Sequence, residues 1–89
     1  IFVGEEVDIC IHFSPDVPHE IITSRRWHTT QKVKELANGG LELRMRVSGT
    51  QELFSWVLGF GAGAEVIEPE TLRNQVATEL DAMKRVYYG

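Results

Sequence analysis

The residues best suited to chemistry lie in the short basic stretch Arg25–His28, in which two arginines precede the indole of Trp27. Two guanidinium groups beside an aromatic ring can bind phosphates and stack on a base. Lys32 and Lys34 follow in the chain, and Arg44 and Arg46 add positive charge if the next strand pairs in a suitable register. A helix-to-strand junction with a core tryptophan and a solvated charged face is the structural alternative. The candidate residues for a polyanionic ligand are Arg25, Arg26, Trp27, His28 and Gln31.

Metal and cofactor motifs are weak in this sequence. Cys10 and His12 share one face of a predicted strand, and His28 could lie on a neighbouring strand. These are too few ligands, at unremarkable spacing, for a zinc site. The segment 59–64 matches the dinucleotide fingerprint G-x-G-x-x-A, but a predicted helix precedes it and a strand follows, which reverses the required order. We therefore predict neither a metal nor a cofactor.

No serine has the surroundings of a nucleophile. Each serine of the chain has a capping, turn or helix-surface explanation, and these serines are Ser14, Ser24, Ser48 and Ser55. The sequence contains no G-x-S-x-G elbow. We therefore expect that the chain is not an enzyme. An acylphosphatase-like activity is the enzymatic alternative for the fold predicted below.

The elements that must position these residues follow from periodicity. Alternation of apolar and polar residues predicts strands over 7–13 and 41–47, and β-branched and aromatic residues predict one over 27–36. Asn38-Gly39-Gly40 predicts a hairpin turn, and 64–67 a fourth strand. Helical spacing predicts helices over 16–24 and 50–60 and a last helix that opens at Glu68–Glu70. This βαββαβ order plus a terminal helix predicts an α+β ferredoxin-like plait with a four-stranded antiparallel sheet.

Composition indicates one small globular domain spanning residues 1–89. The hydrophobic content is 43%, the charged content 25% and the net charge −4, so a non-specific duplex binder is not expected. The chain opens with Ile1 rather than methionine, which indicates a piece of a longer protein. No apolar run approaches the roughly 20 residues of a membrane span, and we expect a reducing cytoplasmic location and no membrane partner.

Four stretches in order resemble a known family: Ile9–Ser14 (ICIHFS), Arg26–Gln31 (RWHTTQ), Asn38–Leu43 (NGGLEL) and Glu52–Arg73 (ELFSWVLGFGAGAEVIEPETLR). Together they are similar to the C-terminal extension of WYL-domain bacterial transcription regulators, the WCX domain. Thr30 stands where the family usually has serine, which is a conservative difference.

The resemblance implies a regulatory and dimerisation module. Such regulators carry a winged helix-turn-helix domain that binds operator DNA, then a WYL domain, and neither of these two lies in this chain. It further implies a homodimer and an effector, including single-stranded nucleic acid, bound next to the WYL domain. Arg73, in the first turn of the last helix, is a further effector-binding candidate; its structural alternative is an ion pair with Glu70 or Glu68.

Two other functions stay open. One is a regulatory module of the ACT type that binds a small molecule such as an amino acid. The other is a purely structural oligomerisation domain without a ligand. An RNA-recognition motif is not favoured, because the strand over 41–47 contains no aromatic residue on which a base could stack.

Overall fold

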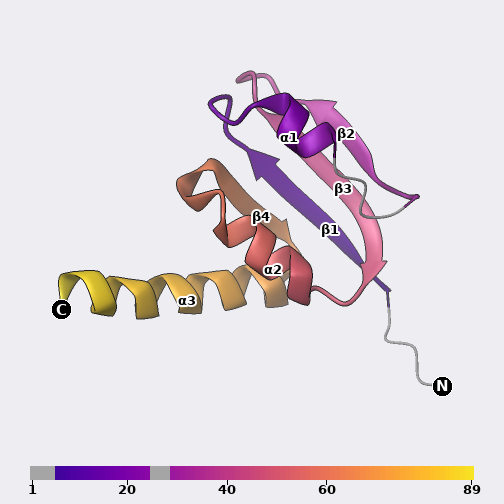
Figure 1. Cartoon of the computed structure of the whole chain (residues 1–89). Coiled ribbons are helices and arrows are strands. Elements are labelled where there is room, and N and C mark those ends of the chain that lie inside the picture. The colour runs from indigo at the N-terminus through magenta and orange to yellow at the C-terminus, as the bar shows by residue number, and fades with distance from the viewer. Residues whose placement is uncertain (1–5, 25–28) are drawn as a thin grey trace.

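The computed structural model describes residues 6–24 and 29–89, which form one four-stranded sheet and three α-helices (Figure 1). The strands are β1 (Glu6–Phe13), β2 (Lys32–Glu35), β3 (Leu41–Ser48) and β4 (Ala64–Glu68). The helices are α1 (His19–Thr23), α2 (Gln51–Leu58) and α3 (Glu70–Tyr88), with a 3-10 turn at Gly61–Gly63. The α+β class, the four-stranded sheet and the C-terminal helix are thereby confirmed.

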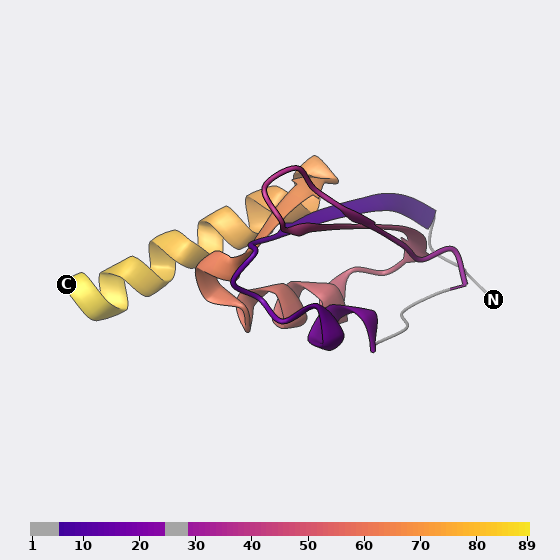
Figure 2. The same ribbon diagram turned by 90° about the horizontal axis from the view of Figure 1, so that it is seen from above.

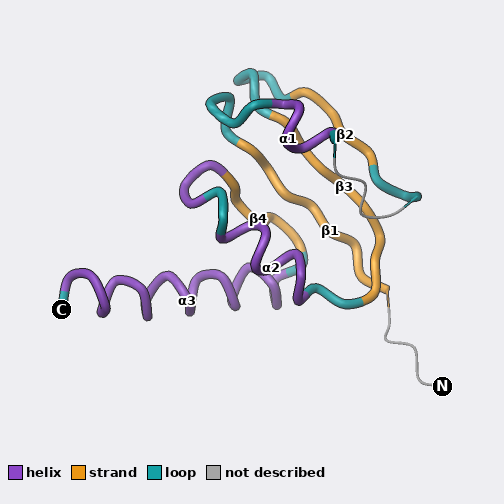
Figure 3. The backbone as a smooth tube through the Cα atoms, in the orientation of Figure 1, coloured by secondary structure: helices purple, strands orange, loops and turns teal. Residues whose placement is uncertain are grey.

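The sheet has the strand order β2-β3-β1-β4, and every neighbouring pair is antiparallel (Figure 3). β1 and β3 therefore form its centre, and β2 and β4 are its edges. The succession of elements agrees with the predicted βαββαβ order followed by a helix. The ferredoxin-like plait expected from this succession stays a prediction.

The core lies between the sheet and the helices α1 and α2, which cover the same face (Figure 2). Inward side chains of β1 and β3 alternate with polar ones, as the period of two requires. Phe13, Trp56 and Phe60 meet edge to face, with ring centroids 5.0–5.6 Å apart. The buried core residues are Ile9, Ile11, Phe13, Val17, Ile22, Leu41, Leu43, Met45, Val47, Leu53, Val57, Val66 and Leu72.

The predicted hairpin turn joins β2 to β3 at Asn38–Gly40. Gly39 has a φ of +90°, which a residue with a side chain rarely adopts. A Cβ atom on Gly40 would collide with the carbonyl oxygen of Phe13. Both glycines are therefore required by the backbone, the first by its conformation and the second by close packing against β1.

Three elements are shorter than the sequence predicts, namely α1, β2 and α2, and α2 ends at Leu58 instead of at residue 60. α1 begins at His19, not at residue 16, because the Ser14 hydroxyl accepts a hydrogen bond from the amide of Asp16 and forms a turn instead of a helix cap. β2 begins at Lys32, and residues 29–30 form a turn. There the Thr30 side chain bonds both the N–H and the C=O of Arg46, the groups that a longer β2 would have paired with.

The apolar stripe of α3 packs over only part of its length. Leu72 is 1% exposed and Val76 is packed against the core, whereas Leu80 is 50% and Tyr87 77% exposed. α3 starts beside β4 and then extends past the end of the sheet (Figure 1), so its second half has no surface beneath it. None of the described helices combines the length and apolar content that a membrane span needs.

Candidate functional site

The sheet face opposite α1 and α2 is covered by no described helix, and we call it the open face (Figure 2). Its side chains come from the polar positions of the alternating strands. Antiparallel register places residues opposite one another on the same face. The residues of the open face are Asp8, Cys10 and His12 of β1, Lys32 and Lys34 of β2, Glu42, Arg44 and Arg46 of β3, and Glu65 and Glu68 of β4.

Register arranges these residues in rows that cross the sheet. One row runs from Lys34 through Glu42 and His12 to Glu65. The next runs from Lys32 through Arg44 and Cys10 to Glu68. Cations of β2 and β3 therefore lie on one side of the face, and carboxylates of β4 on the other.

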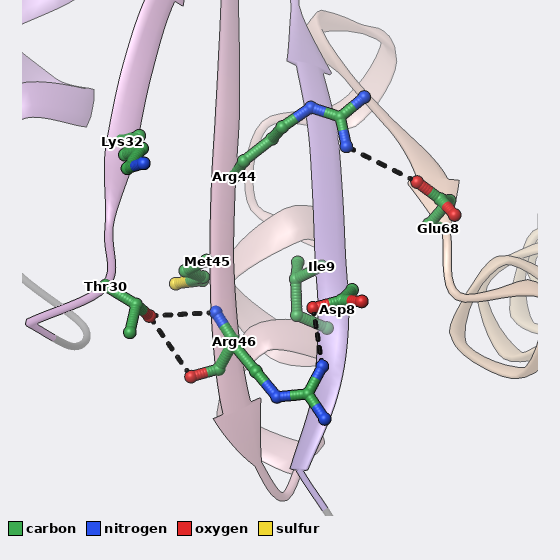
Figure 4. A pocket seen from close by; sticks show the side chains of 8 residues that line it. All are labelled: Asp8, Ile9, Thr30, Lys32, Arg44, Met45, Arg46 and Glu68. Carbon is green, nitrogen blue, oxygen red and sulfur yellow. Dashed lines mark hydrogen bonds and ion pairs between the residues drawn. The ribbon is translucent and has the colours of Figure 1, made fainter.

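An open depression of about 590 Å³ lies over the second of these rows and over the neighbouring Asp8–Arg46 pair (Figure 4). Arg46 Nη1 donates to Asp8 Oδ1 at 2.9 Å, and Arg44 Nη1 lies 3.6 Å from Glu68 Oε1. Arg44 reaches across β1 to Glu68 of β4, Arg46 reaches to Asp8 on β1, and both arginine side chains are about half exposed. Lys32 has no ion-pair partner among residues 6–24 and 29–89. The depression thus presents three cations, two of them held in place by acids.

Beside this depression, Glu42 is the centre of a hydrogen-bonded network. Arg44 Nε donates to Glu42 Oε1 at 2.8 Å, and His12 Nε2 lies 2.9 Å from Glu42 Oε2. The hydrogen bond from Arg44, followed by that from His12, lowers the pKa of Glu42 from about 4.5 to about 2. Glu42 therefore stays ionised at neutral pH although its residue is only 9% exposed.

Cys10 lies in the same part of the open face. It is 0% exposed, yet it lies on the polar side of β1, opposite Arg44. Burial raises the pKa of its thiol, and the charge of Arg44 acts in the opposite direction. Cys10 is thus a protonated thiol within a polar network, and it is not a member of the hydrophobic core cluster.

Of the predicted site residues, the structure describes only Gln31 and Arg73. Arg25, Arg26, Trp27 and His28 lie outside the described residues. Gln31 is half-buried directly before the edge strand β2.

Arg73 lies at the opposite edge of the sheet. It donates from Nη1 to Glu65 Oε2 at 2.9 Å and to the Val66 carbonyl at 2.8 Å. Its ion-pair partner is therefore Glu65, and not Glu70 or Glu68, which the structural alternative to effector binding named. Two strands separate Gln31 from Arg73, roughly 14 Å at usual strand spacing, so the fold does not bring them together.

Sequence reasoning anticipated the basic residues of the open face but missed its acids. Arg44 and Arg46 were expected to share a face with the basic stretch if register allowed, and Lys32 does lie opposite Arg44. Asp8, Glu42 and Glu68 were not identified as their partners. The alternation of each strand marks these acids as outward-facing, but only the register across the sheet identifies the contacts.

Comparison with known proteins identifies a family for this chain. No curated protein matches the chain in sequence. The model of the WCX domain family matches residues 5–84, which confirms the resemblance to that domain. Because this match spans nearly the whole chain, the protein belongs to the WCX domain family.

Proposed function

We propose that this WCX domain is a regulatory module of a cytoplasmic bacterial transcription regulator, and that its open face binds an anionic effector, short single-stranded nucleic acid. In this proposal the chain acts beside a WYL domain and a helix-turn-helix domain of the same protein, and operator DNA is bound by the latter. The chain itself performs no catalysis. Membership of the WCX family supports the regulatory role.

The observation that carries the effector proposal is the trio of cations around the open depression. Lys32 and Arg44 are cross-strand neighbours, and Arg46 follows two residues along β3, about 7 Å further. Arginine binds phosphate through two parallel N–H donors. Because the chain as a whole is acidic, with a net charge of −4, attraction of a polyanion depends on this local cluster.

The acids of the open face fit this proposal in a specific way. Asp8 holds the side chain of Arg46, and Glu68 holds that of Arg44, before a ligand arrives. Side chains held in advance lose less conformational entropy when they bind. An incoming phosphate then shares the guanidinium groups with these acids, and the counterions that the neutralised phosphates release make binding depend strongly on salt.

The mechanism that we propose couples the effector to the arrangement of a homodimer. An effector that contacts both the open face and the WYL domain favours whichever arrangement offers both contacts. The spacing of the two DNA-binding domains on their half-sites changes with that arrangement. Binding of the effector therefore changes the affinity of the dimeric regulator for its operator.

For the dimer contact, we propose the second half of α3, with a second copy of the chain as its occupant. Leu80, Met83 and Tyr87 continue the stripe that begins at the buried Leu72, but they are 40–77% exposed. An apolar patch on a free helix end can pair with its own copy about a two-fold axis.

Fluorescence anisotropy of a labelled short oligothymidylate tests the effector proposal, with the WYL domain joined to the chain. Lys32→Ala with Arg46→Ala is expected to weaken binding by about tenfold or more, because two cations no longer face the phosphates. Lys84→Ala with Arg85→Ala removes the same charge from exposed positions of α3 and is expected to change affinity by less than about twofold. Equal weakening in both double variants would contradict a site on the open face.

Two further measurements separate the alternatives. Arg25→Ala with Arg26→Ala in the same assay decides whether the basic stretch contributes, and unchanged binding removes both residues from the site. A melting temperature that rises with amino acids but not with oligonucleotides favours a small-molecule module of the ACT type. A response to neither ligand favours a structural oligomerisation domain.

A further inference from the structure

Cys10 has surroundings that a structural cysteine does not need. Its residue is 0% exposed and is one of the buried apolar residues, but it is not packed in the hydrophobic core cluster and lies on the polar side of β1, opposite Arg44. The groups that act on its thiol are Arg44, Glu42 and Glu68. A small apolar residue would fill the same space without contributing a soft ligand atom.

Three different ligand types meet at this point of the open face. Cys10 Sγ, His12 Nε2 or Nδ1 and a carboxylate oxygen of Glu42 lie within 4.8 Å of one another. His12 Nε2 and Glu42 Oε2 are already 2.9 Å apart. In a tetrahedral zinc site, bonds of about 2.0–2.3 Å place ligand atoms about 3.4–3.6 Å from one another. Side-chain adjustments of about 1 Å therefore suffice to surround one ion.

The backbone fixes this arrangement. His12 and Glu42 are direct partners in the β1–β3 register, and Cys10 is two residues from His12 on the same side of β1. All three ligands lie on the two central strands, which are the most constrained part of the sheet. Sites built on strands hold their ligands more accurately than sites on loops. A pair from β1 alone has too few ligands, and Glu42 supplies the third.

A fourth donor and the balance of charge can be supplied by Glu68, which lies outside the group of three ligands within 4.8 Å of one another. Glu68 is the β4 partner of Cys10 in the register, and its carboxylate lies beside Arg44. With a divalent ion, the thiolate and the carboxylates of Glu42 and Glu68 together carry three negative charges. The ion and the Arg44 guanidinium carry three positive charges. A bound ion therefore leaves the cluster neutral once the thiol has released its proton to solvent.

We propose that Cys10, His12 and Glu42 bind a divalent transition metal of the zinc class on the open face, with Glu68 as the fourth ligand. Thiolate, imidazole and carboxylate together are the donor set that zinc takes in proteins. The ion ties β1 to β3 and, through Glu68, to the edge strand β4. The site shares Glu68 with the ion pair that holds Arg44, but Lys32 and Arg46, the residues changed in the nucleic-acid assay, are not among its ligands.

Titration of the chain with Co²⁺ alone tests the proposal, because the thiolate-to-cobalt charge-transfer band reports a metal–sulfur bond. Cys10 is the single cysteine of the chain, so this band has one possible source. We expect a band that saturates at one ion per chain and disappears when Zn²⁺ is added. No band at excess Co²⁺, or saturation at one ion per two chains, overturns the proposal.

Variants identify the other ligands. Cys10→Ser is expected to abolish the band, and His12→Gln and Glu42→Gln each to weaken Co²⁺ binding by about tenfold or more. His19→Gln is the matched control, because its ring lies on α1 and contacts the Gly39 carbonyl instead. Circular dichroism shows whether each variant is folded, and His12→Gln at an accessible position tests the site even if Cys10→Ser unfolds. A band of unchanged affinity in folded His12→Gln and Glu42→Gln would show adventitious thiol binding and overturn the site.

Discussion

Among the described residues, Glu42 is one whose ionisation is changed strongly by the fold. Two hydrogen bonds, from Arg44 and His12, favour its charged form and lower its pKa to about 2. A group with a lowered folded-state pKa contributes stability above its unfolded pKa, and this contribution disappears as pH falls through the folded value. The pH window for Glu42 therefore extends from about 4.5 down to about 2.

We predict that in Glu42→Gln the free energy of unfolding depends less on pH at acid pH than it does in the wild-type chain. In the wild-type chain the free energy of unfolding should fall between about pH 4.5 and pH 2, and this fall should be smaller in the variant. Urea unfolding followed by circular dichroism at several pH values, with a chelator present, measures it. Glu35→Gln, on the exposed strand β2, is the control and should retain the wild-type fall. If the free energy of unfolding falls equally with pH in Glu42→Gln and in the wild type, the hydrogen bonds from Arg44 and His12 do not stabilise the ionised form of Glu42.

The sequence could identify the side of β3 on which Glu42 lies, but not its partners. Alternation places Glu42, Arg44 and Arg46 together on the outward side, and this was predicted correctly. The contact with His12 depends on a register between strands 30 residues apart, which no local pattern encodes. Long-range pairing therefore accounts for the part of the candidate site that could not be predicted.

At the scale of elements, α3 shows most clearly what periodicity can and cannot determine. Its apolar residues recur at helical spacing from Leu72 to Tyr87, a pattern typical of one packed face, and the last helix forms as expected. A stripe carries no information about how far the partner surface extends. The sheet ends near the middle of the helix, so the same pattern is core at Leu72 and exposed at Leu80.

The same substitution at these two positions should therefore have different costs. Leu72→Ala is expected to lower the free energy of unfolding by about 2–5 kcal/mol, because it leaves a cavity at a residue that is 1% exposed. Leu80→Ala should cost less than about 1 kcal/mol at chain concentrations too low for association, because its side chain is half exposed. Urea denaturation of both variants measures the difference, and similar costs would show that the end of α3 is packed in the monomer.

Substitutions in the exposed half of α3 test the proposed dimer. Leu80→Ser with Tyr87→Ser should shift the sedimentation equilibrium from dimer to monomer, because both residues lie on the stripe. Tyr88→Ser is the matched control, since Tyr88 is 87% exposed but points away from the stripe by helical geometry. A dimer that survives the double variant excludes this helix as the interface.

The short elements were predicted with the right type but the wrong limits. Pro18 directly precedes α1, and the side chain of Ser14 forms a turn, so the helix starts three residues later than its composition indicates. Composition also favours a strand through Thr29 and Thr30, but the Thr30 hydroxyl takes the place of backbone pairing to Arg46. In both cases a side chain competes with the backbone for its hydrogen bonds, and average propensities do not include this competition.

For the whole molecule, the order of elements and the family were accessible from the sequence, and the distribution of charge was not. Alternation, the glycine hairpin and the helical stripes are local patterns, and they indicated the correct α+β succession. The pairing of cations with acids across the open face arises only when the strands assemble. Arg73 and Gln31 lie at opposite edges of the sheet, and the order of the strands alone sets the distance between them.

The salt dependence of oligothymidylate binding tests the central claim, that the open face recognises phosphates, most directly. For single strands the magnitude of the slope of log K against log salt concentration falls by about 0.7 for each phosphate that the protein no longer neutralises. We predict that Lys32→Ala with Arg46→Ala reduces this magnitude by about 1.4, whereas Lys84→Ala with Arg85→Ala leaves it unchanged. A slope that is the same in the wild type and the open-face variant would contradict the claim.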